Sequence, residues 1–240
     1  MKFLKTSLLA AVSFFSLASI AQTADEIVNK HIEAVGGREK LSQIKSVVLQ
    51  SSMDVMGNSA PMTVTILNGK GYKSEVDFNG QKIVQAFTDK GGWSINPMTG
   101  ATDAQPMPAD QFSAGKSQIN VGGPLFDYAA RGSKIELAGK EKVGDVDAFK
   151  LQLTSADNKV STYYIDPTTY YLVKTVMTLN MGGQEGEVSV TFSDYRKTDV
   201  GYVLPYAIST TLSQGFTMDA TVNKVDINTE VDPKIFEMPQ

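Results

Sequence analysis

Residues 161–179 read STYYIDPTTYYLVKTVMTL, and they carry the clearest signal for the fold. Proline fixes its own φ and donates no backbone hydrogen bond, so Asp166 to Thr169 is predicted to form the turn of a β-hairpin. In the run that follows, Val173, Met177 and Leu179 share one face, and more polar residues occupy the other. The stretch therefore predicts an antiparallel sheet with one face on an apolar interior and one face in water.

The same period of two recurs along most of the chain after Ser46. Asn79-Gly80, between two alternating runs, is among the strongest short signals for a hairpin. The apolar face shifts by one residue between Val222 and Val225, which predicts a β-bulge. Together these runs give about eleven strands in hairpin order, without the strand–helix–strand alternation that is typical of parallel sheets.

A helix is predicted over Thr23 to Val35, because apolar residues recur there at helical spacing. Thr23 is a suitable N-cap, and Glu26 three residues later completes a capping box. Gly36-Gly37 ends this helix, and Arg38 to Ile44 is predicted to form a second, short one. The expected fold class is α+β: one long antiparallel sheet, curled into a half-barrel and wrapped over the N-terminal helix and a helical lid segment.

The lid segment is the longest interruption of the strand pattern, from Pro97 to Ala130. It is rich in proline, with a short helix expected from Pro108 to Gly115. Long interruptions of a sheet are commonly functional or mobile. The residues expected to cover the interior from this segment are Leu125, Phe126 and Tyr128.

The first residues form a targeting segment. Two lysines precede an apolar run from Leu8 to Ile20, and small residues follow it. Cleavage is expected after Ala21, which divides the chain into a signal peptide, 1–21, and one mature domain, 22–240. The run is short for a membrane span, so the mature protein is expected to be soluble in the periplasm of a Gram-negative bacterium.

Composition excludes several kinds of chemistry. The chain has no cysteine, so it has no disulfide or thiolate site, and His31 is its one histidine. No metal site, no cofactor and no catalytic residue is therefore expected, and the nucleophile-elbow and Walker patterns are absent. Removing Lys2 and Lys5 with the signal peptide leaves 20 basic and 26 acidic residues, a net charge of −6. That balance argues against nucleic acid as a partner.

Methionines and aromatic residues gather on the predicted apolar strand faces. Methionine adapts to irregular apolar partners, so these residues could line a cavity for hydrocarbon. The alternative is that they fill a solid core, as such residues commonly do. The candidate lining residues are Met53, Met62, Val64, Phe87, Trp93, Met177, Phe192 and Met218.

Several segments resemble the outer-membrane lipoprotein carrier and sorting proteins, the LolA/LolB-like group. These are the helix that opens at Thr23, the hairpin from Tyr164 to Lys174, the segment from Phe192 to Tyr206, and the end of the chain from Ile235 to Pro239. The resemblance implies a half-barrel of antiparallel strands whose open side is covered by helices. It also implies a cavity that accepts the acyl chains of lipoproteins.

Two functions follow as hypotheses. The first is a non-enzymatic periplasmic carrier, a monomer that buries an acylated or otherwise hydrophobic ligand, with the sorting of lipoproteins to the outer membrane as one such role. The second is a protein–protein interaction module of the envelope, with a filled core and an apolar docking surface. A cavity of several hundred cubic ångströms would favour the first hypothesis over the second.

Overall fold

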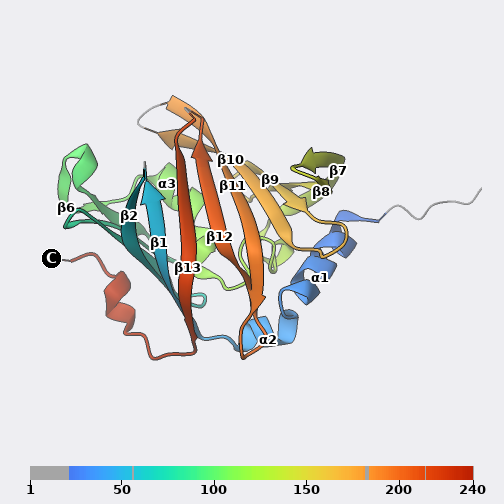
Figure 1. Cartoon of the computed structure of the whole chain (residues 1–240), viewed down its shortest axis with the longest axis horizontal. Helices are drawn as coiled ribbons and strands as arrows, with labels where there is room; N and C mark the ends of the chain where they lie inside the picture. The colour runs from blue at the N-terminus through green and yellow to red at the C-terminus, as the bar shows by residue number, and fades with distance from the viewer. Residues whose placement is uncertain (1–21, 56, 182–183, 214, 240) are drawn as a thin grey trace, which may run out of the picture.

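The computed structural model describes residues 22–55, 57–181, 184–213 and 215–239, so the predicted signal peptide lies outside the described residues. One antiparallel sheet of 13 strands organises the fold, in the order β6-β5-β4-β3-β2-β1-β13-β12-β11-β10-β9-β8-β7. The sheet is open, and it curls around the helices on its concave side (Figure 1). The expected α+β half-barrel is confirmed.

Every neighbouring pair of strands in the sheet is antiparallel, and the only non-consecutive pair is β1 with β13. The strands are β1 (Ser46–Val55), β2 (Asn58–Leu67), β3 (Gly71–Phe78), β4 (Gln81–Thr88), β5 (Gly92–Asn96), β6 (Ala101–Pro106), β7 (Lys134–Val143), β8 (Val146–Thr154), β9 (Val160–Ile165), β10 (Leu172–Met181), β11 (Gln184–Lys197), β12 (Val203–Leu212) and β13 (Thr217–Ile227). The helices are α1 (Ala24–Ala34), α2 (Arg38–Gln43), α3 (Ala109–Gly115) and the short 3-10 turns η1 (Pro97–Thr99), η2 (Lys116–Ile119), η3 (Ala129–Arg131) and η4 (Pro233–Phe236).

The hairpin of β9 and β10 forms as predicted. The Asp166 carboxylate accepts from the backbone N–H of Thr168 at 2.7 Å, and the Tyr170 N–H donates to the Asp166 carbonyl at 2.9 Å. These bonds close the turn between β9 and β10. One detail differs, because a register shift between Leu172 and Lys174 pairs Leu172 with Ile165 and leaves Val173 in the bulge.

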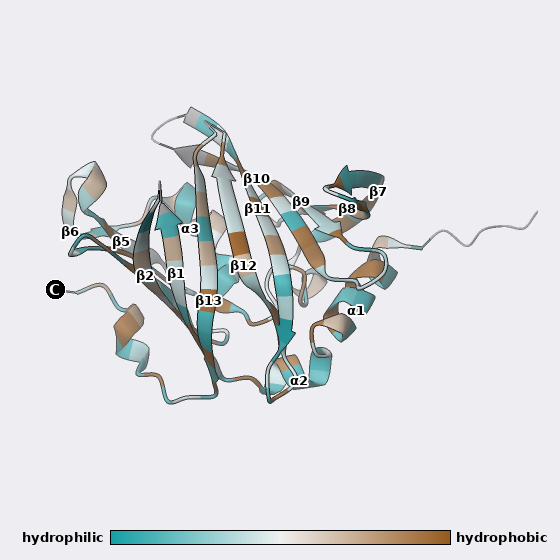
Figure 2. Cartoon of the chain, viewed as in Figure 1, coloured by the Kyte–Doolittle hydropathy of each residue, from teal (hydrophilic) through white to brown (hydrophobic). Residues whose placement is uncertain are grey.

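Other local predictions are confirmed. Asn79 and Gly80 both have positive φ, at 55° and 78°, as a two-residue hairpin turn requires. The β1–β13 register shifts between Gln50 and Ser51, where the sequence predicts a bulge near Val222. Along β12 and β13, hydrophilic and hydrophobic residues follow one another as the two faces alternate (Figure 2).

The strand count exceeds the expectation of about eleven. Part of the difference is β6, which lies inside the segment that the sequence led us to expect as loop and lid. β6 pairs only with β5 and carries Pro106 at its end, so it forms an edge of the sheet. Its residues lack the apolar alternation that marks a strand in sequence, because both of its faces are largely exposed.

The N-terminal helix α1 is capped as predicted. The Thr23 hydroxyl accepts from the Glu26 N–H at 3.2 Å, and the Glu26 carboxylate accepts from the Thr23 N–H at 3.0 Å. The capping box satisfies two donors that the first helical turn would otherwise leave free. The helix begins one residue after its cap and ends before Gly36-Gly37.

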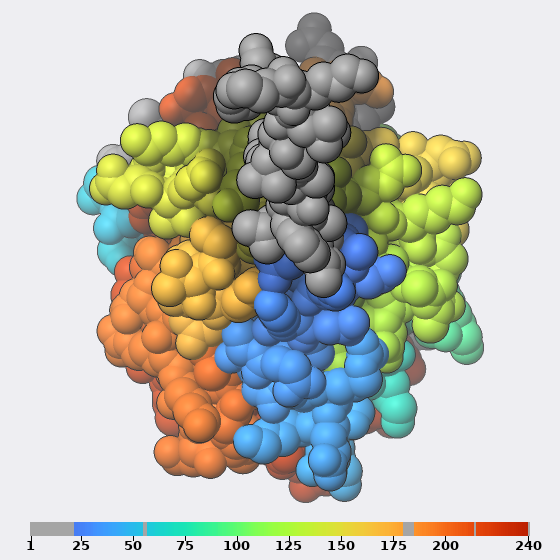
Figure 3. Space-filling model, turned by 90° about the vertical axis from the view of Figure 1, so that its right-hand side faces the viewer, coloured from blue at the N-terminus to red at the C-terminus, as the bar shows by residue number. Residues whose placement is uncertain are grey.

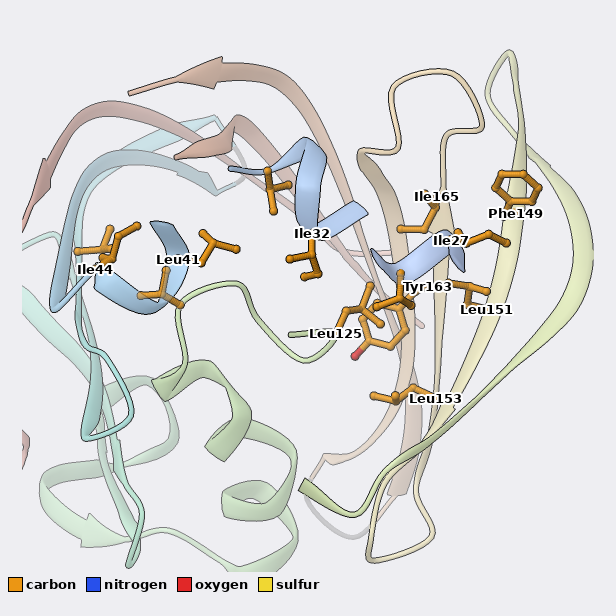
Figure 4. Packing of buried hydrophobic residues seen from close by; sticks show 14 residues of the cluster. Ile27, Ile32, Leu41, Ile44, Leu125, Phe149, Leu151, Leu153, Tyr163 and Ile165 are labelled. Atoms are coloured by element: carbon orange, nitrogen blue, oxygen red, sulfur yellow. The ribbon is translucent and has the colours of Figure 1, made fainter. Parts of the chain in front are cut away.

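The main core lies between α1, α2 and the concave face of β7–β9 and β1. Ile27, Leu41, Leu151 and Ile165 are completely buried there. Side chains from the helices, from the strands and from the connecting segment at Leu125 point toward one another (Figure 4). Seen from the side, the N-terminal helices lie between the orange strands and the green connecting segment (Figure 3).

A smaller cluster lies on the convex face, where Val84, Ala86 and Trp93 pack together. The Trp93 indole N–H donates to the Phe236 carbonyl at 2.8 Å, which fastens η4 to the sheet. Gly71 leaves room for the Phe236 ring, since a Cβ at Gly71 would lie 2.5 Å from its Cγ. The C-terminal turn therefore stabilises the convex side of the sheet at β3–β5.

The close contact predicts a cost for Gly71→Val. A side chain at Gly71 must displace Phe236, so the free energy of unfolding should fall by about 1–3 kcal/mol and the emission of Trp93 should change. Urea unfolding followed by Trp93 fluorescence measures both. The matched control is Gly91→Val, because a Cβ at Gly91 has open space around it. Equal stability of the two variants would contradict this account of η4.

Candidate ligand cavity

A cavity of about 830 Å³ opens between the two arms of the curled sheet. Its walls come from β4 and β5 on one side, β10 on the other side, and the helix α3 between them. Its volume falls in the range that small-molecule sites occupy in proteins. The apolar residues that line it include Ile83, Phe87, Met107, Ala114, Met177 and Leu179.

The helix α3 reaches the sheet closely because of one glycine. A Cβ at Gly115 would lie 2.3 Å from Cζ of Phe87, so any larger residue there would push the Phe87 ring or the helix aside. Phe87 is buried, and its ring lies 5.7 Å from that of Tyr72, centroid to centroid. Gly115 and Phe87 thus fix how far α3 stands from the sheet.

A polar contact holds α3 to the opposite arm. The Ser113 hydroxyl donates to the Asp157 carboxylate, in the turn between β8 and β9, and Ser155 donates to the same carboxylate at 2.6 Å. The Lys159 ammonium donates to the Asp110 carbonyl at 3.2 Å. Hydrogen bonds from Ser113 and Ser155 lower the pKa of Asp157 to about 2, so the carboxylate is ionised at neutral pH. We call Ser113, Asp157 and Lys159 the α3 latch.

Strand register places seven of the eight candidate lining residues on the concave face. Residues that pair across antiparallel strands point to the same side of the sheet. On β3, Val76, Ser74 and Tyr72 share one face: Val76 pairs with Met62, Ser74 with Val64, and Tyr72 with Phe87. On the other strands the concave face carries Met53, Met177, Phe192 and Met218.

Only two of these seven, Phe87 and Met177, line the cavity. Met53, Met62, Phe192 and Met218 are half-buried on the concave face, and Val64 is buried there. The sequence therefore predicts the face of the sheet better than it predicts the cavity.

Trp93 lies on the other face. It pairs with Ala86, which is one residue away from the concave Phe87, and it joins the convex cluster beside Phe236. The structure thus separates Trp93 from the other candidates. The physical reason is the turn at Gly91, which pairs Gly92 with Phe87. This pairing determines which β5 residues face the concave side, and the sequence pattern alone does not determine it.

The candidate lid residues pack against α1 and α2. Leu125 is 2% exposed and belongs to the main core. The Tyr128 hydroxyl donates to Asp25, and burial with this carboxylate raises the pKa of Tyr128 to about 12. The Arg38 guanidinium lies 5.3 Å from the Phe126 ring centroid. None of the three residues lines the cavity, which α3 covers instead.

The apolar cavity residues that the sequence analysis did not propose as lining include Ile83, Met107, Ala114 and Leu179. Ile83 lies four residues before Phe87 and Leu179 lies two residues after Met177. Strand alternation therefore predicts that each shares the concave face with its neighbour. Met107 and Ala114 belong to the interrupting segment, and nothing in their local pattern points to a cavity.

His31 is buried, and its Nδ1 lies 2.8 Å from the Tyr170 carbonyl, to which it donates. Burial lowers the pKa of His31 below its ordinary value of 6.5. The imidazole of His31 therefore takes up a proton more readily in the unfolded chain than in the folded one. The free energy of unfolding is then highest above about pH 6.5 and decreases as the pH falls.

We therefore expect the free energy of unfolding to decrease between about pH 7 and pH 5.5 more steeply in the wild type than in His31→Asn. The amide introduced by this substitution can still donate to the Tyr170 carbonyl but does not titrate. Urea unfolding at a series of pH values measures the two slopes. Parallel slopes would contradict the buried, neutral state of His31.

Within the described residues, no group of three or more His, Asp or Glu side chains could hold a metal ion. A search of the same residues finds no helix with the length and hydropathy to cross a membrane.

Comparisons with known proteins agree on the fold. No family model matches the sequence, and no curated protein matches it either. Among solved structures, a domain of a putative outer membrane lipoprotein-sorting protein from Vibrio parahaemolyticus is 14% identical, with a TM-score of 0.56, and the match covers 87% of this chain and 97% of that one. A LolA superfamily protein from Nitrosomonas europaea is 13% identical, with a TM-score of 0.58 and coverage of 90% and 98%. A DUF1329 family protein from Desulfovibrio piger is 12% identical, with a TM-score of 0.59 and coverage of 89% and 96%. The chain thus shares its fold with these three proteins, one of them a LolA superfamily protein, as the sequence resemblance implied.

Proposed function

We propose that this protein is a non-enzymatic carrier that binds an acylated or otherwise hydrophobic ligand in the cavity beneath α3. We also propose that it acts in the periplasm as a monomer, 22–240, after cleavage behind Ala21. Sorting of lipoproteins to the outer membrane is the specific role that the LolA-like fold suggests.

The observation that carries the proposal is the cavity of about 830 Å³ on the concave face. This partly open cavity lies apart from the filled main core, and it is much larger than the voids that closely packed side chains leave. The cavity has an apolar wall on both arms of the sheet, with Ile83 and Phe87 on one arm and Met177 and Leu179 on the other.

Burial of hydrocarbon supplies the affinity. Each methylene group that leaves water contributes about 0.8 kcal/mol, so a chain of ten or so carbons can overcome the loss of translational freedom on binding. The half-buried methionines outside the cavity, Met53, Met62 and Met218, extend the apolar surface along the concave face. A longer chain could follow this surface.

The first test uses N-phenyl-1-naphthylamine, an uncharged apolar probe whose emission rises in apolar surroundings. We expect a saturable increase at one probe per protein, reversed by long-chain ligands. Trp93 is not a suitable reporter, because it lies on the convex face. No saturable increase at micromolar concentrations would refute the carrier function and favour a docking module with a filled core.

A further inference from the structure

The polar part of the cavity wall is made mainly of uncharged side chains. Gln85 and Ser94 form a cross-strand pair on β4 and β5, on the same face as Ile83 and Phe87. Between the two arms, Gln111 of α3 and Gln118 of η2 also line the cavity. Amides and hydroxyls can each donate and accept hydrogen bonds. These side chains therefore suit a ligand head group that also both donates and accepts hydrogen bonds.

Charged side chains contribute little that an anion could use. The charged residues that line the cavity are Asp110, Lys159 and Glu185. Among the described residues that line the cavity Lys159 is the one cation; its ammonium donates to the Asp110 carbonyl, and the nearby Asp157 carboxylate offsets its charge. Glu185 lies at the margin, since its register gives it the strand face opposite to that of Met177.

A carboxylate or phosphate brought to these walls would meet an excess of negative charge, because two acidic side chains and one ammonium line them. Removing an ionised group from water is costly unless it finds a partner of opposite charge and hydrogen bonds. An amide or hydroxyl head exchanges water for the glutamine and serine groups at little cost. The two kinds of head group therefore differ in binding although their acyl chains are the same.

We propose that the cavity selects amphiphiles with an uncharged, hydrogen-bonding head, an amide or a hydroxyl, and discriminates against carboxylate and phosphate heads. This inference rests on the proposed carrier function and specifies its class of ligand. An acylated peptide and a neutral glycolipid both carry such a head, so the two sources share one chemistry.

The test compares ligands with one twelve-carbon chain by calorimetric titration at pH 8, each below its micellar concentration. N-dodecanoylglycinamide carries an amide head, dodecyl glucoside carries hydroxyls, and dodecanoate carries a carboxylate. We expect the Kd of dodecanoate to be about tenfold higher than that of the tighter neutral ligand. Tight binding of the amide alone identifies acylated peptides as the source, and tight binding of the glucoside alone identifies neutral glycolipids.

A gain-of-function variant sharpens the test. Gln85→Lys places a cation on the cavity wall, so dodecanoate should bind about tenfold more tightly than it binds the wild type. The matched control is Gln50→Lys, which makes the same change at an exposed position of β1, on the convex face. Gln118→Lys gives a second position if Gln85→Lys does not fold, as judged by circular dichroism.

The outcomes separate the two proposals. If dodecanoate binds the wild type as tightly as the neutral ligands, or if both cavity lysines leave its affinity unchanged, the head-group selectivity is wrong and the carrier function stands. If no amphiphile binds and N-phenyl-1-naphthylamine also fails, the carrier function itself is wrong.

Discussion

Ala114→Trp is expected to raise the Kd for apolar ligands at least about tenfold while leaving the fold intact. Ala114 is half-buried on α3 and lines the cavity between Met177 on one arm and Phe87 on the other. A tryptophan there would occupy space that the proposed ligand needs. The new ring would rest on apolar side chains, so its own burial is favourable and offsets local strain.

The matched control is Ala109→Trp, the same change at the first residue of the same helix. Ala109 is exposed and does not line the cavity. Titration with N-phenyl-1-naphthylamine should give wild-type affinity for Ala109→Trp and weak binding for Ala114→Trp. Equal binding by the two variants would show that the ligand does not occupy this cavity.

Leu125→Ala is expected to lower the free energy of unfolding by about 2–5 kcal/mol. The reason is the position of Leu125 in the main core, against α1 and the concave face of β8 and β9. A residue of a mobile lid would cost little when truncated, because its side chain would gain and lose contacts as the lid moves. The stability of this variant therefore distinguishes a core segment from a lid.

Met98→Ala is the control for this measurement. Met98 belongs to the same interrupting segment but is 63% exposed, so its truncation should change stability by less than about 0.5 kcal/mol. Chemical denaturation of both variants measures the difference. A small effect at Leu125 would contradict the packing described and restore the lid interpretation for Leu125, Phe126 and Tyr128.

Much of the fold could be predicted from the sequence because its signals are local. The Asp166–Thr169 turn, the Asn79-Gly80 turn and the Thr23–Glu26 capping box each depend on residues close together in the chain. Alternation along each strand then fixed which residues share a face, and so seven of the eight candidate lining residues lie on the concave side.

The rest depended on distances across the fold. The side of Trp93 follows from the register that the turn at Gly91 sets between β4 and β5. The cavity forms where α3 meets both arms of the sheet, through the contact of Gly115 with Phe87 and of Ser113 with Asp157. No local sequence pattern predicts the contact of Gly115 with Phe87 or that of Ser113 with Asp157. The sequence therefore could not distinguish the residues of the cavity from those of the wider concave face.

The most direct test of the carrier function is native mass spectrometry of the protein purified from its native host, with lipid extraction of the same sample. We predict one bound mass per protein that organic extraction removes, and its absence from Ala114→Trp. A ligand-free mass in the wild type, with no uptake from added acylated peptide, would contradict the carrier function.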